Sequence, residues 1–379
     1  MAPLGRMSVL RGARSGARGL LQQFDVVLLG LTALLVLFGI LMIRSSAAGS
    51  PSLEGLAARQ AQYALAGAAV VALGPFVNYK TLQGLAGGMY VLAALLLGAI
   101  LAVGTTAFGA QRWFDFFGLF FVQPSELVKI GSVVWLASFF ARRREQMLEF
   151  RWVLISLGYA GFPVVMVLLQ PNLSTAAMLG FIWFGIAWAA GLRWTHLGLL
   201  TLLAAASTPL LWLGLVPYQR ARISNFLFPD IAGGARYNVE QALISIGSGG
   251  WLGQGYGQSS QVQLRFLKVR HTDFIFSASA AEFGFVGALV LLGLLALLVL
   301  RLLQIARQSD DAFGAYLCYG LATLFFVQTV LNVSVNLNLF PVAGLALPFV
   351  SYGGSALLAA AVGIAIALSV NAQRNPRKF

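Results

Sequence analysis

Residues 265–301 read RFLKVRHTDFIFSASAAEFGFVGALVLLGLLALLVLR, and this stretch decides the fold. Three cations and a histidine precede Asp273, and from Phe274 to Leu300 the only charged residue is Glu282. An apolar run of about 20 residues matches the hydrocarbon thickness of a bilayer. The stretch therefore predicts a membrane-spanning helix with an acidic residue at its N-terminal end. Because ionisable groups are costly at membrane depth, Asp273 and its basic neighbours are candidates for a functional site.

The composition of the whole chain indicates a membrane protein. Its 379 residues are 59% hydrophobic and 10% charged, whereas a soluble domain carries about 25% charged residues. The cations behind the net charge of +13 lie between apolar runs, so they indicate membrane topology rather than nucleic-acid binding. The single cysteine, Cys318, excludes an internal disulfide and a cysteine-based metal site.

We predict an all-α polytopic membrane protein with about ten transmembrane helices and one long extracytoplasmic loop. The predicted spans are 24–44, 60–78, 82–103, 123–141, 152–170, 172–191, 195–216, 272–303, 313–335 and 348–371. They form one transmembrane domain, 24–371, between a basic tail at 1–23 and a short tail at 372–379. The cations of the short connections place both termini in the cytoplasm by the positive-inside rule.

The long loop, 217–271, lies outside in this topology although it is basic. Long loops escape the positive-inside rule, and a loop of this length is usually functional or disordered. Its apolar clusters predict short helices at or dipping into the outer membrane surface. Its cations are Arg220, Arg222, Arg236, Arg265, Lys268 and Arg270.

A glycine-rich segment, IGSGGWLGQGYG at 246–257, lies within this loop. Glycines allow a phosphate to approach backbone amides closely, here with the Ser248 hydroxyl beside them. The alternative is a flexible bend between two interfacial helices, and the pattern alone does not separate the two.

Three further groups of polar residues have both a structural and a functional interpretation. Glu126 and Lys129 are three apart on one helix face and can pair, either as a clamp or in support of catalysis. Arg112, beside Trp113, is an interfacial anchor or a phosphate ligand. The asparagines of an apolar span that ends near proline and glycine predict either a polar cavity lining or interhelical hydrogen bonds. They are Asn332, Asn336 and Asn338.

Asp273 also has a structural alternative, because Asp273 and Thr272 could cap the following helix. A cap does not need the flanking cations, which favour a functional acid. His271 is expected to tune or hold the site, or to be merely solvated. Glu282 lies deep enough in the span to require a partner, either Lys129 or a hydroxyl.

In order along the chain, these motifs resemble the SEDS family of bacterial cell-wall polymerases, typified by RodA and FtsW. The short tails favour the RodA type. The matching motifs are GAQRW at 109–113, QPSE at 123–126 with Lys129, QP at 170–171, YQ at 218–219, IGSGG at 246–250, HTDF at 271–274 and PFVSYGG at 348–354.

The resemblance implies a peptidoglycan glycosyltransferase that polymerises lipid II in the bacterial cytoplasmic membrane. It implies a single-pass class B penicillin-binding protein, a transpeptidase, as partner. It further implies that Asp273 is the essential acid and that Glu126 and Lys129 are the paired residues of the family.

The chain departs from the family pattern at three places. Asn172 replaces an aspartate, which removes any role for a carboxylate there. Lys268-Val269 replaces Pro-Glu, and Ala281 replaces the first glutamate of Ala-Glu-Glu. The acid of the family is intact at Asp273, so we expect the activity to be kept.

The implied transfer joins α-linked donors into a β-linked polymer, so it inverts the sugar centre and needs a general base, for which Asp273 is the candidate. A divalent cation, Mg²⁺ or Mn²⁺, held by diphosphate oxygens fits this chemistry, whereas no dedicated metal site and no organic cofactor is expected. Membrane lipids and lipid II are the expected partners, and nucleic acid is not. Candidates to bind the departing diphosphate are Arg112, Arg220, Arg222, Arg265, Lys268, Arg270 and Ser248.

Two other functions would use similar residues. A lipid-precursor flippase would need polar groups between spans and would transport without extending a chain. A non-catalytic scaffold for the penicillin-binding protein would leave Asp273 replaceable.

Overall fold

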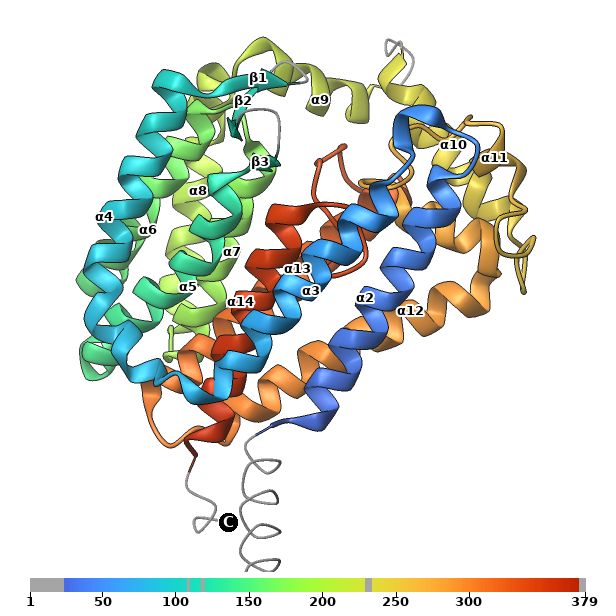
Figure 1. Cartoon of the computed structure of the whole chain (residues 1–379). Coiled ribbons are helices and arrows are strands. Elements are labelled where there is room, and N and C mark those ends of the chain that lie inside the picture. The colour runs from blue at the N-terminus through green and yellow to red at the C-terminus, as the bar shows by residue number, and fades with distance from the viewer. Residues whose placement is uncertain (1–23, 108–109, 117–119, 229–233, 375–379) are drawn as a thin grey trace, which may run out of the picture.

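The computed structural model describes residues 24–107, 110–116, 120–228 and 234–374. The predicted basic tail at 1–23 lies outside the described residues, as do residues 375–379 of the predicted C-terminal tail. The architecture is a bundle of long helices with a cap of short elements at one end (Figure 1).

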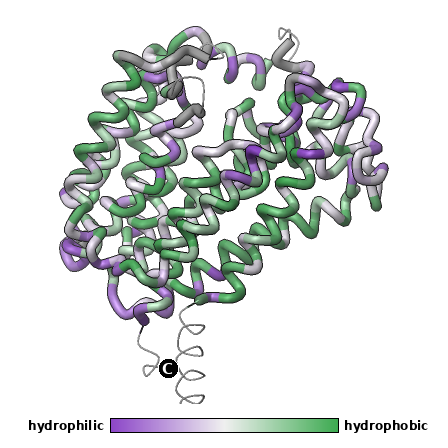
Figure 2. Tube along the Cα trace, in the orientation of Figure 1, coloured by the Kyte–Doolittle hydropathy of each residue, from purple (hydrophilic) through white to green (hydrophobic). Residues whose placement is uncertain are grey.

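The prediction of an all-α polytopic membrane protein is confirmed, because each predicted span corresponds to a long helix. Six of these helices, α2, α4, α6, α12, α13 and α14, are long and apolar enough to cross a membrane. Figure 2 shows apolar residues along the helices and hydrophilic ones gathered toward their ends. The count of ten crossings stays a prediction. The long helices are α2 (Val26–Ala47), α3 (Leu56–Leu73), α4 (Tyr79–Val103), α5 (Pro124–Arg142), α6 (Phe150–Leu169), α7 (Leu173–Ala189), α8 (Trp194–Gly214), α12 (Ile275–Arg307), α13 (Ala312–Asn336) and α14 (Gly354–Ala372).

Polar residues fix where several of these helices begin. The Asp25 carboxylate accepts the Leu28 amide at the start of α2 and pairs with Arg301 of α12 at 2.8 Å. Asn172 accepts the Thr175 amide at the start of α7, 3.3 Å away. An asparagine caps a helix as well as an aspartate does, so the departure at Asn172 leaves this helix start satisfied.

The core lies where α13 packs against α12, α7, α5 and α14. Nearly every residue of α5 from Pro124 to Phe140 is buried, whereas α8 is mostly exposed. A helix that is apolar all round and buried belongs to the centre of a bundle. In a membrane the exposed apolar side chains of α8 would face lipid.

The connection 104–122, expected to be a short loop, contains a small antiparallel sheet instead. Its strands are β1 (Thr105–Ala107), β2 (Ala110–Phe116) and β3 (Phe120–Val122), in the order β1-β2-β3. The long connection contains the expected short helices α9 (Pro217–Leu227), α10 (Gly234–Ser248) and α11 (Ser260–Gln263). Short 3-10 turns complete the chain at η1 (Pro51–Leu53), η2 (Gly74–Phe76) and η3 (Arg144–Leu148). The sheet and α9–α11 lie at the same end of the bundle (Figure 1).

Helix α12 is broken at Gly284, whose backbone has φ 69° and ψ −166°. The glycine-rich segment packs on this break and bonds the backbone groups that the break frees. The amides of Gln254 and Gly255 donate to the Ala281 and Glu282 carbonyls, each at 3.0 Å. In the other direction, amides of α12 donate to loop carbonyls: Phe285 to Gly250 at 2.8 Å and Val286 to Trp251 at 3.1 Å.

These bonds change the interpretation of the glycine-rich segment. The amides of Gly253, Gln254 and Gly255 all donate to protein carbonyls, so they are not available to a phosphate. The glycines are needed for close packing instead. A Cβ on Gly253 would lie 2.1 Å from the Glu282 carbonyl oxygen, and one on Gly249 would lie 2.0 Å from that of Ala280. Of the two alternatives that the pattern left open, a phosphate site is therefore contradicted for these three amides.

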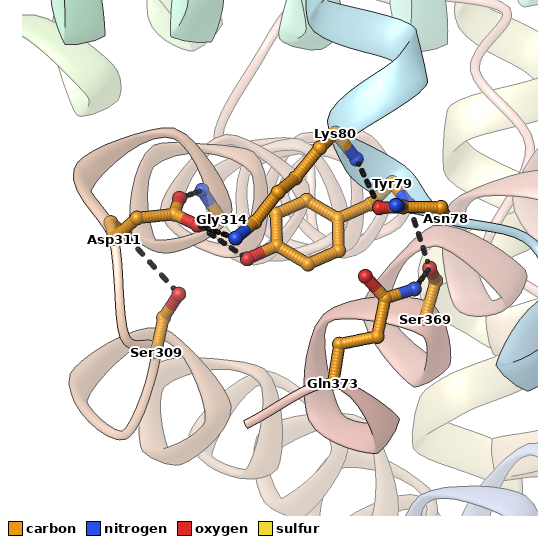
Figure 3. A network of polar contacts seen from close by, with 8 residues as sticks. All are labelled: Asn78, Tyr79, Lys80, Ser309, Asp311, Gly314, Ser369 and Gln373. Carbon is orange, nitrogen blue, oxygen red and sulfur yellow. Dashed lines mark hydrogen bonds and ion pairs between the residues drawn. The ribbon is translucent and has the colours of Figure 1, made fainter. Parts of the chain in front are cut away.

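At the opposite end of the bundle, one polar network joins three helix ends (Figure 3). Asp311 accepts the Gly314 amide at the start of α13 and the Tyr79 hydroxyl at the start of α4, at 2.7 and 2.5 Å. The Ser369 hydroxyl, near the end of α14, accepts the Tyr79 amide at 3.0 Å. Lys80 adds an ion pair to Asp311 at 3.7 Å. The network fixes the ends of α4, α13 and α14 relative to one another.

The packing of the glycine-rich segment on α12 predicts different costs for two alanine substitutions. Gly253→Ala should lower the free energy of unfolding by about 2–5 kcal/mol, because it adds overpacking to the cost of a left-handed backbone. Gly257→Ala should cost only about 1–2 kcal/mol, since Gly257 also has positive φ but open space around it. Thermal unfolding of the detergent-solubilised variants measures both, and equal losses would contradict the packing described here.

Candidate functional site

Asp273 lies in the turn before α12 and is partly buried. The N-cap of α12 is Phe274, which makes no side-chain cap hydrogen bond. The Thr272 hydroxyl donates to the Val269 carbonyl at 3.3 Å. Among the described residues, the Asp273 carboxylate accepts no hydrogen bond. The structure thus contradicts the interpretation of Asp273 and Thr272 as a helix cap, and leaves the carboxylate available to a ligand.

Three consecutive carbonyl groups hold this turn in place. The His271 carbonyl accepts the Tyr352 amide at 2.9 Å, and the Thr272 carbonyl accepts the Ser351 hydroxyl at 2.7 Å. The Asp273 carbonyl accepts two side-chain amides of α13. The HTDF motif is therefore fixed by two parts of the chain that follow it by about 60 to 80 residues.

The segment between α13 and α14 passes beside the carboxylate. Gly344 has φ +63°, and a Cβ on it would lie 3.9 Å from Asp273 Oδ2. A glycine here supplies the left-handed backbone and keeps a side chain away from the acid. Asn332 holds the same segment, because its Nδ2 donates to the Leu345 carbonyl at 2.7 Å.

The electrostatic setting suits a base. Burial by the surrounding protein raises the pKa of Asp273 to about 6, and the positive charge of Arg222 opposes the shift. Burial, with the charge of Arg270 second, lowers the pKa of His271 to about 4. At neutral pH the acid is therefore ionised and the histidine is uncharged.

The predicted cations of α9 and β2 have different surroundings. Arg222 of α9 is the cation whose charge acts on Asp273. Arg220, on the same helix, donates Nη2 to the Leu213 carbonyl at 2.6 Å and so ties α9 to the end of α8. The side chains of Arg112 and Arg236 lie outside the described residues.

The cations that precede Asp273 contact the protein itself. Arg265 donates to the Gly49 carbonyl in the connection after α2, and Arg270 donates to the Ser46 carbonyl in the last turn of α2, at 2.7 Å. Lys268 lies over the Tyr237 ring, 5.6 Å from its centroid. These contacts anchor the turn to α2 and α10. The binding of substrate by Arg265, Lys268 and Arg270 stays a prediction.

Ser248 stays a predicted substrate ligand without support from its contacts. It is exposed at the end of α10, and its hydroxyl donates to the Ser245 carbonyl of the same helix at 2.9 Å.

Glu126 and Lys129 form the predicted pair, with Lys129 Nζ 2.9 Å from Glu126 Oε2. Both are buried, and Lys129 also reaches the Gln328 amide oxygen at 3.4 Å. Gln328 in turn donates to the Ala346 carbonyl at 2.8 Å. A small cavity lies between the pair and residues 346–351. The pair is thereby linked to the segment that passes beside Asp273, which fits a supporting role.

Glu282 accepts a hydrogen bond from the Ser45 hydroxyl of α2. The sequence required a partner for it, either Lys129 or a hydroxyl, and the hydroxyl is confirmed. Glu282 also lies next to the break in α12, so its contacts hold α2 against the irregular part of that helix.

Gln328, Ser277 and Ser45 were not among the predicted site residues. A signal for Gln328 was present, because Gln328, Asn332 and Asn336 follow one another at intervals of four along α13 and so share one face. Ser277 and Ser45 carried no such signal, since serines are common at close helix contacts in membranes.

The described residues contain no group of three or more His, Cys, Asp or Glu side chains that could hold a metal ion. Asp273 is a single carboxylate in the turn before α12. Mg²⁺ is often bound by one or two carboxylates together with substrate phosphates. The Asp273 carboxylate therefore fits a metal ion that is brought with a diphosphate.

Comparison with known proteins gives a consistent result. Residues 25–376 match the model of the FtsW/RodA/SpoVE family, described as cell cycle protein. The chain is 35% identical over 355 residues to the peptidoglycan glycosyltransferase MrdB of Escherichia coli, covering 93% of this chain and 95% of that one. It is 37% identical over 379 residues to a probable peptidoglycan glycosyltransferase FtsW of Marinobacter nauticus, covering 96% and 92%.

The chain is also similar to solved structures, among them the following two. The first, described as the structural coordination of polymerization and crosslinking by a peptidoglycan synthase complex, superimposes with a TM-score of 0.77 at 32% identity, covering 92% of this chain and 97% of that one. The rod shape determining protein RodA of Thermus thermophilus gives a TM-score of 0.69 at 32% identity, covering 93% and 97%.

The buried pair predicts non-additive effects on stability. Lys129→Met alone should lower the free energy of unfolding by about 3–5 kcal/mol, because it leaves the Glu126 charge buried without its partner. The double variant Glu126→Gln with Lys129→Met should recover most of that loss. Thermal unfolding of the two variants tests this, and a double variant less stable than Lys129→Met would contradict a buried ion pair.

Proposed function

The chain belongs to the FtsW/RodA/SpoVE family, and we propose that it polymerises lipid II into glycan strands at the outer leaflet of the bacterial cytoplasmic membrane. It is a peptidoglycan glycosyltransferase, like the relatives it matches over nearly its whole length. The observation that carries the proposal is one available carboxylate, Asp273, held at the mouth of α12 within the field of Arg222.

The transfer needs a base that acts on an alcohol. A hydroxyl of the acceptor sugar attacks the anomeric carbon of the donor, and a new carbon–oxygen bond forms. The bond from that carbon to the diphosphate oxygen breaks, and the lipid diphosphate leaves with the electron pair. The hydroxyl proton passes to the Asp273 carboxylate, whose pKa of about 6 lies close enough to neutral pH for general-base catalysis. Attack opposite the leaving group converts the α-linked donor into a β-linked product.

Positive charge at the leaving group is the second requirement. Arg222 is the first candidate, because its charge already acts at the position of Asp273. Arg220 lies two residues away on α9, and Arg112 lies on the neighbouring sheet at the same end of the bundle. Arginine binds phosphate oxygens with paired donors, which suits a diphosphate.

A divalent cation, when bound, would neutralise charge on the diphosphate oxygens. Asp273 would be the carboxylate that contacts such an ion, together with the diphosphate oxygens themselves. The remaining steps depend on residues of the chain: Arg222 orients the diphosphate, and the acceptor lies next to Asp273 and the neighbouring residues 344–346.

A single-pass class B penicillin-binding protein is the proposed partner. The support is the similarity to a structure described as a peptidoglycan synthase complex, in which polymerization and crosslinking are coordinated. Purified protein with lipid II and Mg²⁺ or Mn²⁺, assayed with and without this partner, tests both proposals. A flippase would move lipid II across vesicles and yield no extended glycan.

Asp273→Asn should abolish glycan synthesis, because it keeps the shape of the side chain and removes its capacity to accept a proton. Asp310→Asn makes the same chemical change three residues after the far end of α12 and should leave synthesis unchanged. Gel separation of the glycan products from labelled lipid II measures both variants. Glycan of normal length from purified, folded Asp273→Asn would reject Asp273 as the base.

The pH dependence of the polymerisation rate should follow the ionisation of the Asp273 carboxylate. With a raised pKa, Asp273 is ionised and active above about pH 6 and protonated below it. The initial polymerisation rate should therefore fall as the pH decreases through about 6. The lowered pKa of His271, about 4, keeps that residue from producing this fall. A rate that stays constant from pH 7 down to about 5 would contradict the assignment.

A further inference from the structure

We infer that Asn336 is a positioning residue that fixes the Asp273 carboxylate by holding its backbone from α13. The inference rests on the proposed function, since it assigns a support to the base of that reaction. It goes beyond that function because it concerns a buried amide of α13 that acts through the Asp273 backbone.

The side chain of Asn336 makes contacts with both of its polar atoms. It is fully buried, and its Nδ2 donates to the Asp273 carbonyl and to the Asn332 carbonyl, each at 2.9 Å. Its Oδ1 accepts the Ser277 amide at 3.0 Å and the Ser277 hydroxyl at 2.6 Å. A buried amide with both ends bonded has one orientation only.

These contacts supply what α12 lacks at its start. The N-cap residue, Phe274, has no side chain that can accept a hydrogen bond. Ser277 is the third residue of the helix, and amides of the first turn have no partner within a helix. Asn336 therefore provides the cap from a different helix, while its amide nitrogen holds the carbonyl of the adjacent Asp273.

The face of α13 that carries Asn336 also sets the segment opposite the acid. Asn332 donates to the Asp273 carbonyl at 3.1 Å and to the Leu345 carbonyl at 2.7 Å. Gln328 donates to the Ala346 carbonyl at 2.8 Å. One row of side-chain amides on a rigid helix thus fixes the distance between the base and the neighbouring residues 344–346.

Positioning and capping make different demands on the side chain. An acceptor oxygen is enough for a cap, so an aspartate would serve as well as an asparagine. Holding the Asp273 carbonyl from position 336 needs a donor, which an ionised aspartate lacks. Misplacement of a catalytic group by about 1 Å can cost roughly a hundredfold in rate. Asn336→Asp therefore separates the two roles.

The test compares two identical substitutions two residues apart. Asn336→Asp should fold and bind its partner, and should lower kcat for lipid II polymerisation by about 10-fold or more with KM changed less than about threefold. Asn338→Asp, at an exposed side chain outside these contacts, should keep both constants. Wild-type kcat in folded Asn336→Asp would overturn the inference.

If Asn336→Asp does not fold, a second variant, Ser277→Ala, tests the positioning role of Asn336. Ser277→Ala removes only the hydroxyl that orients the Asn336 amide and keeps the capped backbone amide. It should fold and lower kcat by about threefold or more at unchanged KM, and an unchanged kcat would overturn the inference.

Asp273→Asn, assayed beside these variants, keeps the two proposals apart. An active Asp273→Asn would reject the proposed base. An inactive Asp273→Asn together with a fully active Asn336→Asp would reject only the positioning role.

Discussion

Backbone amides and carbonyls cannot be left without partners in a bilayer, and this constraint governs the irregular parts of the structure. Helix α12 has two such parts, its uncapped start after Asp273 and its break at Gly284. Distant segments satisfy both. Asn336 of α13 bonds the Ser277 amide at the start, and the glycine-rich segment after α10 bonds the backbone on both sides of the break.

The same bonds that satisfy the backbone place the acid. Because the His271, Thr272 and Asp273 carbonyls are all bonded to side chains or amides of α13 and the following segment, the carboxylate is fixed while remaining available. Its partial burial raises its pKa toward neutrality. A base that is held on a rigid frame and is ionised at neutral pH is what inverting transfer to a hydroxyl requires.

The lengths of the apolar segments and the polar, proline and glycine residues between them were enough to predict the helices. The reason is that the thickness of the bilayer sets a similar length for every membrane-spanning helix. The Glu126–Lys129 pair was predictable for the same local reason, a spacing of three on one face. The sheet at 105–122 was missed because two of its three strands have only three residues each. The pattern of residues 246–257 left a phosphate site and a bend open, because the carbonyls that these residues bond lie in α12. Contacts such as Asn336 with Ser277 depend on which helices meet, and spacing along one helix does not reveal its neighbours.

The central claim is that the Asp273 side chain meets the hydroxyl of an incoming sugar. An experimental structure of Asp273→Asn with lipid II and the partner protein tests it most directly. We expect the acceptor hydroxyl within about 3.2 Å of the side chain at position 273, on the extracytoplasmic side and next to residues 344–346. A lipid II molecule bound in another cleft, or a side chain at 273 that faces the cytoplasm, would contradict the account.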